Sequence, residues 1–136
     1  MKALDTNALV RFLVKDDPVQ AEQVHHLLKR HEVRKETLYI PLLVVMELIW
    51  VLQAAYQVDR DEIVGAVNDL MSMPLLEFEQ QSVVRAFVQS AKETSKETSY
   101  DLSDLLIAQS ARQGGCESTL TFDKKASRFE LFEKIA

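Results

Sequence analysis

The chain has 136 residues, of which 47% are hydrophobic and 27% charged, and its net charge is −5. This composition excludes a fibrous or intrinsically disordered protein, and the length predicts a single domain over residues 1–136. The negative charge argues against a broad phosphate-binding face, but it leaves room for a nuclease whose acids are neutralised by metal.

In chain order, the first half of the sequence predicts two strands and four helices. Met1 to Asp5 is short and apolar and ends in an acid, as a buried parallel strand does where it delivers a residue to a site. Asp17 and Pro18 predict a helix start, with aspartate as the cap and proline at the first helical position. The other elements expected here are a helix over 6–14, the amphipathic helix over 19–30, a strand over 38–40, an apolar helix opened by Pro41 and a helix from Asp59 to about Met71.

The second half of the sequence continues this alternation. The expected elements are a strand over 75–78, a helix over 83–91, a polar loop over 92–99, a helix over 101–112, a strand over 119–122 and a short edge strand over 131–135. The helix over 101–112 should stop at Gly114 and Gly115, because glycine adopts a left-handed cap without strain. Strands separated by helices predict an α/β protein, a three-layer α/β/α fold with a central, mainly parallel sheet of four to five strands.

Glu47 is the only charged residue between Glu36 and Asp59, and it lies in the most apolar stretch of the chain. Its same-face neighbours on a helix are all apolar: Leu43, Val44, Trp50 and Val51. We therefore expect its carboxylate to be withdrawn from water, where an unpaired charge costs several kcal/mol. Either a metal ion or a salt bridge to a distant cation such as Arg85 should compensate it.

Three further acids stand in similar settings, so that the candidate site comprises Asp5, Glu47, Asp104 and Asp123. Asp5 and Asp123 fall at the carboxyl ends of strands, where parallel sheets bind ligands, and Asp104 falls in the first turn of its helix. Acids gathered in one cleft repel one another unless a divalent cation sits among them, and oxygen ligands suit Mg²⁺ or Mn²⁺. Each aspartate alone could instead cap a helix, and we favour that role for Asp101.

Other chemistries receive less support from the sequence. The three histidines, His25, His26 and His31, fall on a charged helix surface, and no glycine-rich nucleotide loop is present. The stretch over 38–56 is interrupted by polar residues, which favours a buried helix over a membrane span. With one cysteine and an early acid at Asp5, we expect a cytoplasmic protein. Five basic residues beside the acids are available for phosphates: Arg11, Lys15, Lys124, Lys125 and Arg128.

Four segments carry a resemblance to a known family. They are Leu4-Asp5-Thr6-Asn7-Ala8-Leu9-Val10-Arg11, Met46-Glu47-Leu48, Asp101-Leu102-Ser103-Asp104-Leu105-Leu106-Ile107-Ala108 and Thr119-Leu120-Thr121-Phe122-Asp123. In this order, and over nearly the whole chain, they resemble the PIN-domain family, in particular the VapC-type toxins of bacterial type II toxin–antitoxin pairs.

The resemblance implies a Mg²⁺- or Mn²⁺-dependent endoribonuclease in which a metal-activated water hydrolyses RNA phosphodiester bonds. The implied metal ligands are Asp5, Glu47, Asp104 and Asp123, and Asp101 is an extra acid that either joins them or only caps its helix. The residues implied to orient carboxylates or water are Thr6, Asn7 and Thr121.

The resemblance also implies partners: an RNA substrate such as tRNA or another structured RNA, and a cognate antitoxin with a basic C-terminal segment whose arginine pairs with the acids. We further expect a homodimer, because the Glu47 helix bears more large apolar side chains than one core-facing stripe requires, namely Trp50, Ile49, Leu52 and Tyr56. Two alternatives stay open. One is a PIN nuclease of RNA maturation, and the other is a non-catalytic module that keeps the fold and binds RNA or protein.

Overall fold

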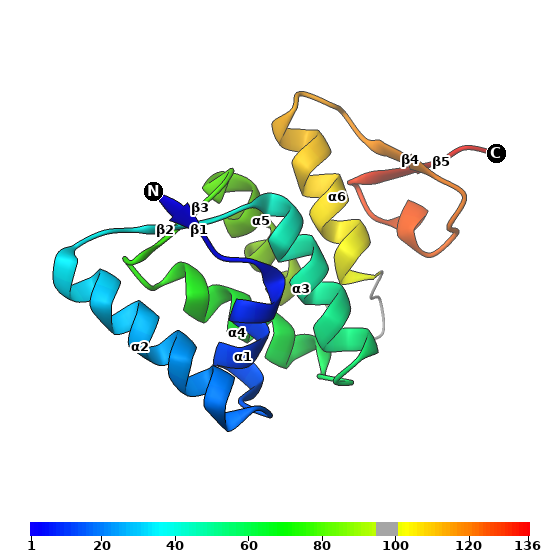
Figure 1. The fold of residues 1–136 in the computed structure, drawn as a ribbon. Helices are drawn as coiled ribbons and strands as arrows, with labels where there is room; N and C mark the ends of the chain where they lie inside the picture. The colour runs from blue at the N-terminus through cyan, green and yellow to red at the C-terminus, as the bar shows by residue number, and fades with distance from the viewer. Residues whose placement is uncertain (95–100) are drawn as a thin grey trace. The chain divides into compact units, whose positions relative to one another are not determined.

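A computed structural model of the protein describes residues 1–94 and 101–136, which fall into two compact units, Met1–Gln81 and Ser82–Ala136. Each unit combines helices with parallel strands (Figure 1), and this confirms the α/β class predicted from the sequence. The described strands form a three-stranded sheet and a two-stranded sheet, where one sheet of four to five strands was expected. Each strand is only two or three residues long, so few hydrogen bonds hold any one pair.

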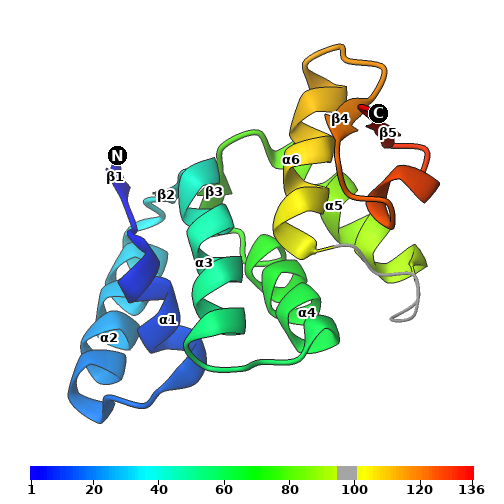
Figure 2. The same ribbon diagram turned by 90° about the vertical axis from the view of Figure 1, so that its right-hand side faces the viewer.

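The first unit holds a three-stranded sheet and four helices. In chain order they are β1 (Lys2–Ala3), α1 (Thr6–Val14), α2 (Pro18–Arg34), β2 (Leu38–Ile40), α3 (Leu42–Ala54), α4 (Arg60–Met71) and β3 (Leu76–Phe78). The strands pair in parallel in the order β1-β2-β3, with Leu38 between Lys2 and Leu76. Helix α1 packs against α2 and α3, and α3 packs against α4 (Figure 2).

Helix α2 begins as the sequence predicts and ends later. The Asp17 side chain accepts a hydrogen bond from the Gln20 N–H at 3.1 Å, with Pro18 at the first helical position. The helix continues past residue 30 to Arg34, where Lys35 takes a left-handed conformation with φ 56°. Its length therefore follows from the cap at Lys35 and not from the apolar stripe alone.

Strand β1 differs from the buried strand that was expected. Both of its residues, Lys2 and Ala3, are exposed, and β1 lies at the edge of its sheet, where it pairs with β2. Burial starts at Leu4, which is 5% exposed. The centre of the first unit is formed by side chains from α1, β2, α3 and α4, namely Leu9, Val10, Leu38, Ile40, Val45, Leu48, Ile49, Leu52, Ile63, Val64, Val67 and Leu70.

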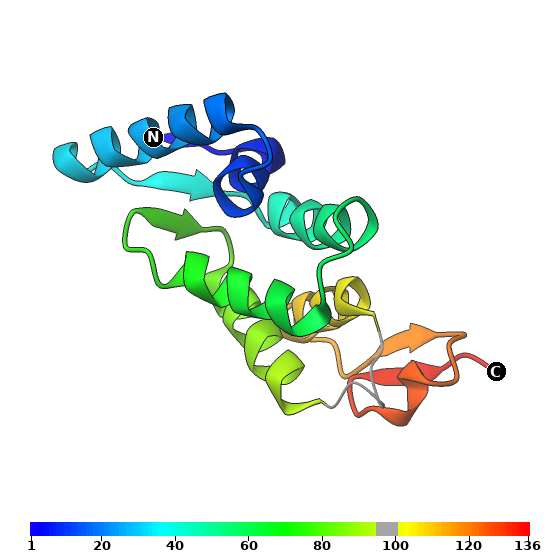
Figure 3. The ribbon, with the colours of Figure 1, turned by 90° about the horizontal axis from the view of Figure 1, so that it is seen from below.

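The second unit is built on two helices and a pair of strands. They are α5 (Gln81–Glu93), which begins at the boundary, α6 (Leu102–Gln113), β4 (Thr119–Thr121), the 3₁₀ helix η2 (Ala126–Arg128) and β5 (Phe132–Lys134). Strands β4 and β5 pair in parallel, with Thr119 beside Phe132, and η2 lies in the connection between them (Figure 3).

The polar loop expected over 92–99 begins later than the sequence suggests. Lys92 and Glu93 still belong to α5, and residues 95–99 lie outside the described part of the chain. The glycine stop after α6 is confirmed, with Gly115 at φ 94°. Within residues 1–94 and 101–136, no helix is both long and apolar enough to span a membrane.

Helices α5 and α6 bury apolar residues around one polar contact. The apolar residues are Val83, Val84, Phe87, Val88, Ala91, Leu102, Leu105, Leu106 and Ala108. The buried Gln109 donates a hydrogen bond from Nε2 to Ser90 Oγ at 2.6 Å, so this amide has a partner in the core.

Candidate functional site

Asp104 of the second unit lies near the negative charges of two other aspartates. Asp101 caps α6, Asp104 lies in the first turn of α6, and Asp123 follows β4. Burial raises the pKa of Asp104, and the negative charges of Asp101 and Asp123 raise it further. Because a second and third carboxylate disfavour its ionised form, this group of side chains favours a cation.

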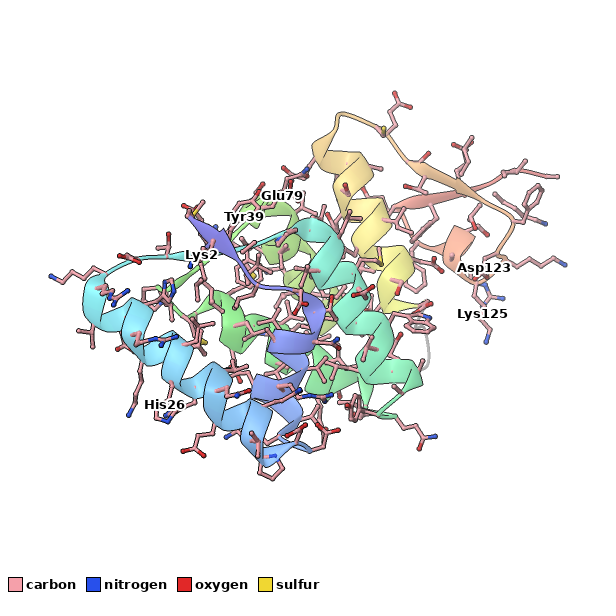
Figure 4. All side chains as sticks on the ribbon, viewed as in Figure 1. Lys2, His26, Tyr39, Glu79, Asp123 and Lys125 are labelled. Atoms are coloured by element: carbon pink, nitrogen blue, oxygen red, sulfur yellow. The ribbon has the colours of Figure 1, made fainter. Side chains whose placement is uncertain are left out.

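Two of these aspartates also hold backbone N–H groups, and each does so with one oxygen. Asp101 Oδ1 accepts from the Ser103 N–H at 3.4 Å, and Asp123 Oδ1 accepts from the N–H groups of Lys125 at 2.8 Å and Ala126 at 3.3 Å. Figure 4 labels Asp123 and Lys125 in this segment. The second oxygen of each carboxylate is not used in these backbone contacts, so capping does not exclude a further ligand.

Thr121 helps to fix the position of Asp123. Its Oγ1 accepts a hydrogen bond from the Asp123 N–H at 3.0 Å, and its carbonyl oxygen accepts from the Ile135 N–H at 2.9 Å. Thr121 was expected to orient a carboxylate or water; its contact here is with the backbone N–H of Asp123, and that role stays a prediction.

Asp5 stands at the carboxyl end of β1 in the first unit. It is exposed and caps α1, with its Oδ1 accepting from the Ala8 N–H at 2.9 Å. The preceding Leu4 N–H donates to the Tyr39 carbonyl at 3.0 Å, so the sheet fixes where the acid emerges. Beside it, Thr6 is buried and Asn7 is exposed.

The prediction that Glu47 is withdrawn from water is wrong. Helix α3 turns Val45, Leu48 and Ile49 inward, and Glu47 points outward on the exposed face. Leu43, 81% exposed, and Trp50, 61% exposed, share that face. Because α3 is apolar on nearly every side, its sequence does not show which residues face the core. Within residues 1–81, Glu47 has no hydrogen bond or ion pair, and it needs none in water.

The same helix corrects part of the argument for a homodimer. Of the four side chains taken as surplus to the core, Ile49 and Leu52 are buried in it and Tyr56 is half-buried. Of these four side chains only Trp50 is exposed. Leu43, on the same helix, is exposed as well.

The donor chemistry of these acids fits a hard cation. Carboxylate oxygens are the ligands that Mg²⁺ and Mn²⁺ prefer, and the pKa of Asp104 is raised by burial and by two neighbouring negative charges, which a cation would offset. The structure brings Asp101, Asp104 and Asp123 together in the second unit, and it places Asp5 and Glu47 in the first. Among residues 1–94 and 101–136, no three histidine, cysteine, aspartate or glutamate side chains are arranged to hold one metal ion.

The sequence matches the PIN domain model over residues 2–131, a range that includes all five acids. The chain belongs to the PIN domain family. A VapC ribonuclease of Aquifex aeolicus (strain VF5) is 23% identical to it over 125 residues, which cover 92% of this chain and 89% of that protein. No solved structure matches the chain at a significant level.

One acid of this PIN domain was missed in the sequence. Glu79 is half-buried at the carboxyl end of β3, and its Oε1 accepts from the Leu42 N–H at 2.7 Å, at the start of α3. Tyr39, labelled with Glu79 in Figure 4, lies near the same carboxylate, and burial and the Glu79 charge raise the pKa of Tyr39. Glu79 thus supplies the cap that Pro41 cannot. The capped Leu42 N–H lies 37 residues earlier in the chain, so no local sequence pattern predicts that Glu79 caps α3.

The five basic residues expected to bind RNA phosphates differ in whether their side chains already have partners in the protein. The Arg11 guanidinium donates to Gln20 Oε1 at 2.7 Å, Asp16 Oδ1 at 2.9 Å and the Tyr56 hydroxyl at 3.3 Å. These contacts tie α1 to α2 and to the segment that follows α3, and the expected contact of Arg11 with RNA stays a prediction. The other four are exposed and have no ion pair within the described residues: Lys15, Lys124, Lys125 and Arg128.

Proposed function

We propose that this PIN domain is a metal-dependent endoribonuclease that hydrolyses RNA phosphodiester bonds. The observation that carries the proposal is the aspartate group around Asp104, in which burial and two neighbouring acids disfavour a third uncompensated charge. The family and the VapC ribonuclease from Aquifex aeolicus support the same chemistry.

In this proposal Mg²⁺ or Mn²⁺ is held by Asp5, Glu47, Asp104 and Asp123. The bound ion acidifies a water and stabilises negative charge on the phosphate. Thr121 keeps Asp123 in place through its backbone N–H, Asp101 serves α6 as a cap, and Thr6 and Asn7 support Asp5. Lys124, Lys125 and Arg128 bind phosphates beside Asp123, and Lys15 does so near the end of α1.

We propose further that the protein acts in the cytoplasm as the toxin of a VapBC-type pair. Its RNA substrate is tRNA or another structured RNA, and an antitoxin with a basic C-terminal segment silences it by pairing an arginine with the acids. The exposed Leu43 and Trp50 on α3 support a homodimer, because apolar side chains of this size gain free energy when a partner covers them.

One observation favours a second function. Asp5, Asp101 and Asp123 each cap a helix or turn, which is a sufficient structural reason for two acids of the site and for the extra acid Asp101. The chain would then be a non-catalytic module that binds RNA or protein. A nuclease of RNA maturation would instead keep the chemistry but lack the antitoxin.

Cleavage by the purified protein separates the enzyme from the module. We expect Mg²⁺ or Mn²⁺ to support cleavage of RNA, chelation to abolish it, and Asp104→Asn to lower it by about 100-fold or more, the loss of about 3 kcal/mol of transition-state stabilisation. The matched control is Asp69→Asn, which removes one exposed aspartate of α4 and should cleave like the wild type. Cleavage that persists in Asp104→Asn or in the presence of a chelator would contradict the proposal.

A further inference from the structure

The ring of Phe122 is exposed next to the candidate site. The chain has six phenylalanines, all in the described residues, and Phe122 alone is exposed, at 73%. It has no ring partner or cation–π contact among the described residues. Leaving this ring in water forgoes the stabilisation that burial gives the others, which points to a ligand for it.

The backbone on both sides of Phe122 is fixed. Before it, the Thr121 carbonyl oxygen accepts from the Ile135 N–H at 2.9 Å, which joins the segment to the end of β5. After it, the Asp123 N–H donates to Thr121 Oγ1 at 3.0 Å, and Asp123 Oδ1 holds the Lys125 N–H at 2.8 Å. The backbone that carries the ring is therefore already held by hydrogen bonds. A ligand that covers the ring would lose little binding free energy to the ordering of this backbone.

Three cations follow Phe122 within a few residues. Lys124, Lys125 and Arg128 are exposed and have no ion pair within the described residues, although the chain as a whole carries a net charge of −5. Figure 4 shows Lys125 close to Asp123 in this segment. An exposed aromatic ring beside free cations is the combination that binds a base and its phosphates in single-stranded nucleic acid.

We propose that Phe122 stacks on an unpaired base of the RNA substrate, whose phosphates lie along Lys124, Lys125 and Arg128. The inference rests on the proposed function and adds the residue that would hold a base next to Asp123, which requires an unpaired nucleotide at that position. A base inside a duplex already stacks on its neighbours and cannot reach the ring. The phosphate next to the stacked base is thereby delivered to Asp123 and Asp104.

An apolar protein segment is the rival occupant, and a second exposed apolar side chain nearby, Leu120, distinguishes it. Leu120, 63% exposed, lies in β4 two residues before Phe122, which follows the end of that strand. A protein contact would use both side chains for their apolar area. RNA stacking needs the planar ring at Phe122 and gains little from Leu120.

Binding measurements test this directly. We would measure fluorescence anisotropy of a labelled single-stranded RNA oligonucleotide and of its blunt duplex, using the full chain in an Asp104→Asn background to prevent cleavage. The variants are Phe122→Ala, Phe122→Leu, Phe122→Trp and Leu120→Ala. Melting temperatures of all four serve as the folding control, and no loss is expected because both side chains are exposed.

Stacking predicts that Phe122→Ala and Phe122→Leu weaken binding of the single strand about tenfold, while Phe122→Trp and Leu120→Ala keep it. Duplex binding should change little in every variant. Equal losses in Phe122→Ala and Leu120→Ala, or full binding by Phe122→Leu, would overturn the inference in favour of an apolar protein contact.

The two proposals fail in different ways. If the wild type cleaves RNA and the Phe122 variants bind it normally, the stacking inference is wrong and the nuclease stands. If the wild type does not cleave RNA with Mg²⁺ or Mn²⁺ but the Phe122 pattern appears in binding, the nuclease is wrong and the stacking inference stands.

Discussion

Asp104 differs from the other aspartates of the site in its surroundings. Asp5, Asp101 and Asp123 accept hydrogen bonds from backbone N–H groups, whereas Asp104 makes no such contact within the described part of its unit. It is half-buried and faces the charges of Asp101 and Asp123. The ionised form of Asp104 is therefore destabilised when no cation is bound.

The raised pKa of Asp104 predicts how Asp104→Asn changes stability with pH. The unfolded carboxyl ionises near 3.8 and the folded one at a higher pH. Its contribution to stability is thus fully present below 3.8 and is lost as the pH rises through the folded pKa. In metal-free buffer the variant should match the wild type in acid and exceed it at neutral pH, by on the order of 0.5 kcal/mol. Chemical denaturation at several pH values measures this, and an advantage that shrinks as pH rises would contradict it.

The helices of the first unit depend on caps from different ranges of sequence. Asp5 directly precedes α1 and caps it through the Ala8 N–H. Helix α3 instead follows Pro41, and its Leu42 N–H is capped by Glu79, which follows β3. The first cap was foreseen as an alternative role for Asp5, because aspartate before a helix is a local signal. The second depends on β3 lying beside β2, which only the folded sheet provides.

The cap at Asp5 predicts that stability and activity separate at this residue. Asp5→Ala should lower the free energy of unfolding by about 1 kcal/mol, because the Ala8 N–H loses its acceptor. Asp5→Asn keeps the acceptor and should unfold like the wild type while losing cleavage. Thermal melts of both variants measure the first effect and an RNA cleavage assay the second. Equal melting temperatures of Asp5→Ala and the wild type would show that the Asp5 cap does not stabilise the protein.

The long-range cap at Glu79 predicts a loss confined to α3. Glu79→Ala leaves the Leu42 N–H without its acceptor, at a cost of about 1–3 kcal/mol. Hydrogen exchange should then speed up at the start of α3 more than in α1, whose cap is intact. Glu77→Ala, at an exposed site two residues earlier, is the control and should exchange like the wild type.

At the scale of the whole chain, the sequence predicted element order well and burial less well. Every described strand and α-helix was foreseen to within a few residues, because apolar period, Asp17-Pro18 and Gly114-Gly115 are local signals. The exposure of Glu47 was not foreseen, since a helix apolar on nearly every side has no stripe that marks its core face. The division of the strands between two sheets also lies beyond local pattern.

Metal binding tests the site through the stability of the full chain. A cation that binds only the folded protein stabilises it by about 2.7 kcal/mol at 100 times its dissociation constant. We expect Mn²⁺ to raise the melting temperature of the wild type by several degrees and that of Asp104→Asn by much less. Asp69→Asn should respond like the wild type. A full rise in Asp104→Asn would place the metal elsewhere.

The exposed apolar face of α3 predicts self-association. Light scattering should show a dimer at tens of micromolar for the wild type, a concentration far above the about 1 µM dissociation constant of a modest interface. Trp50→Glu should shift the protein toward the monomer, because it places a charge in an apolar contact. A wild type that stays monomeric would exclude this face as a dimer interface.

Each capping aspartate uses a single oxygen for its backbone contacts, and this fixes the orientation of the amide when asparagine replaces it. At Asp5 and Asp123 the Oδ1 atom is already bound to backbone N–H groups, which would accept only the oxygen of a side-chain amide. The amide of Asp5→Asn or Asp123→Asn is thereby locked in one orientation, with its NH₂ group turned to where the free carboxylate oxygen was. Each substitution presents a donor to the position of a cation, and so repels the ion as well as lacking charge. These variants keep the fold while emptying the site, which suits them to trapping intact RNA.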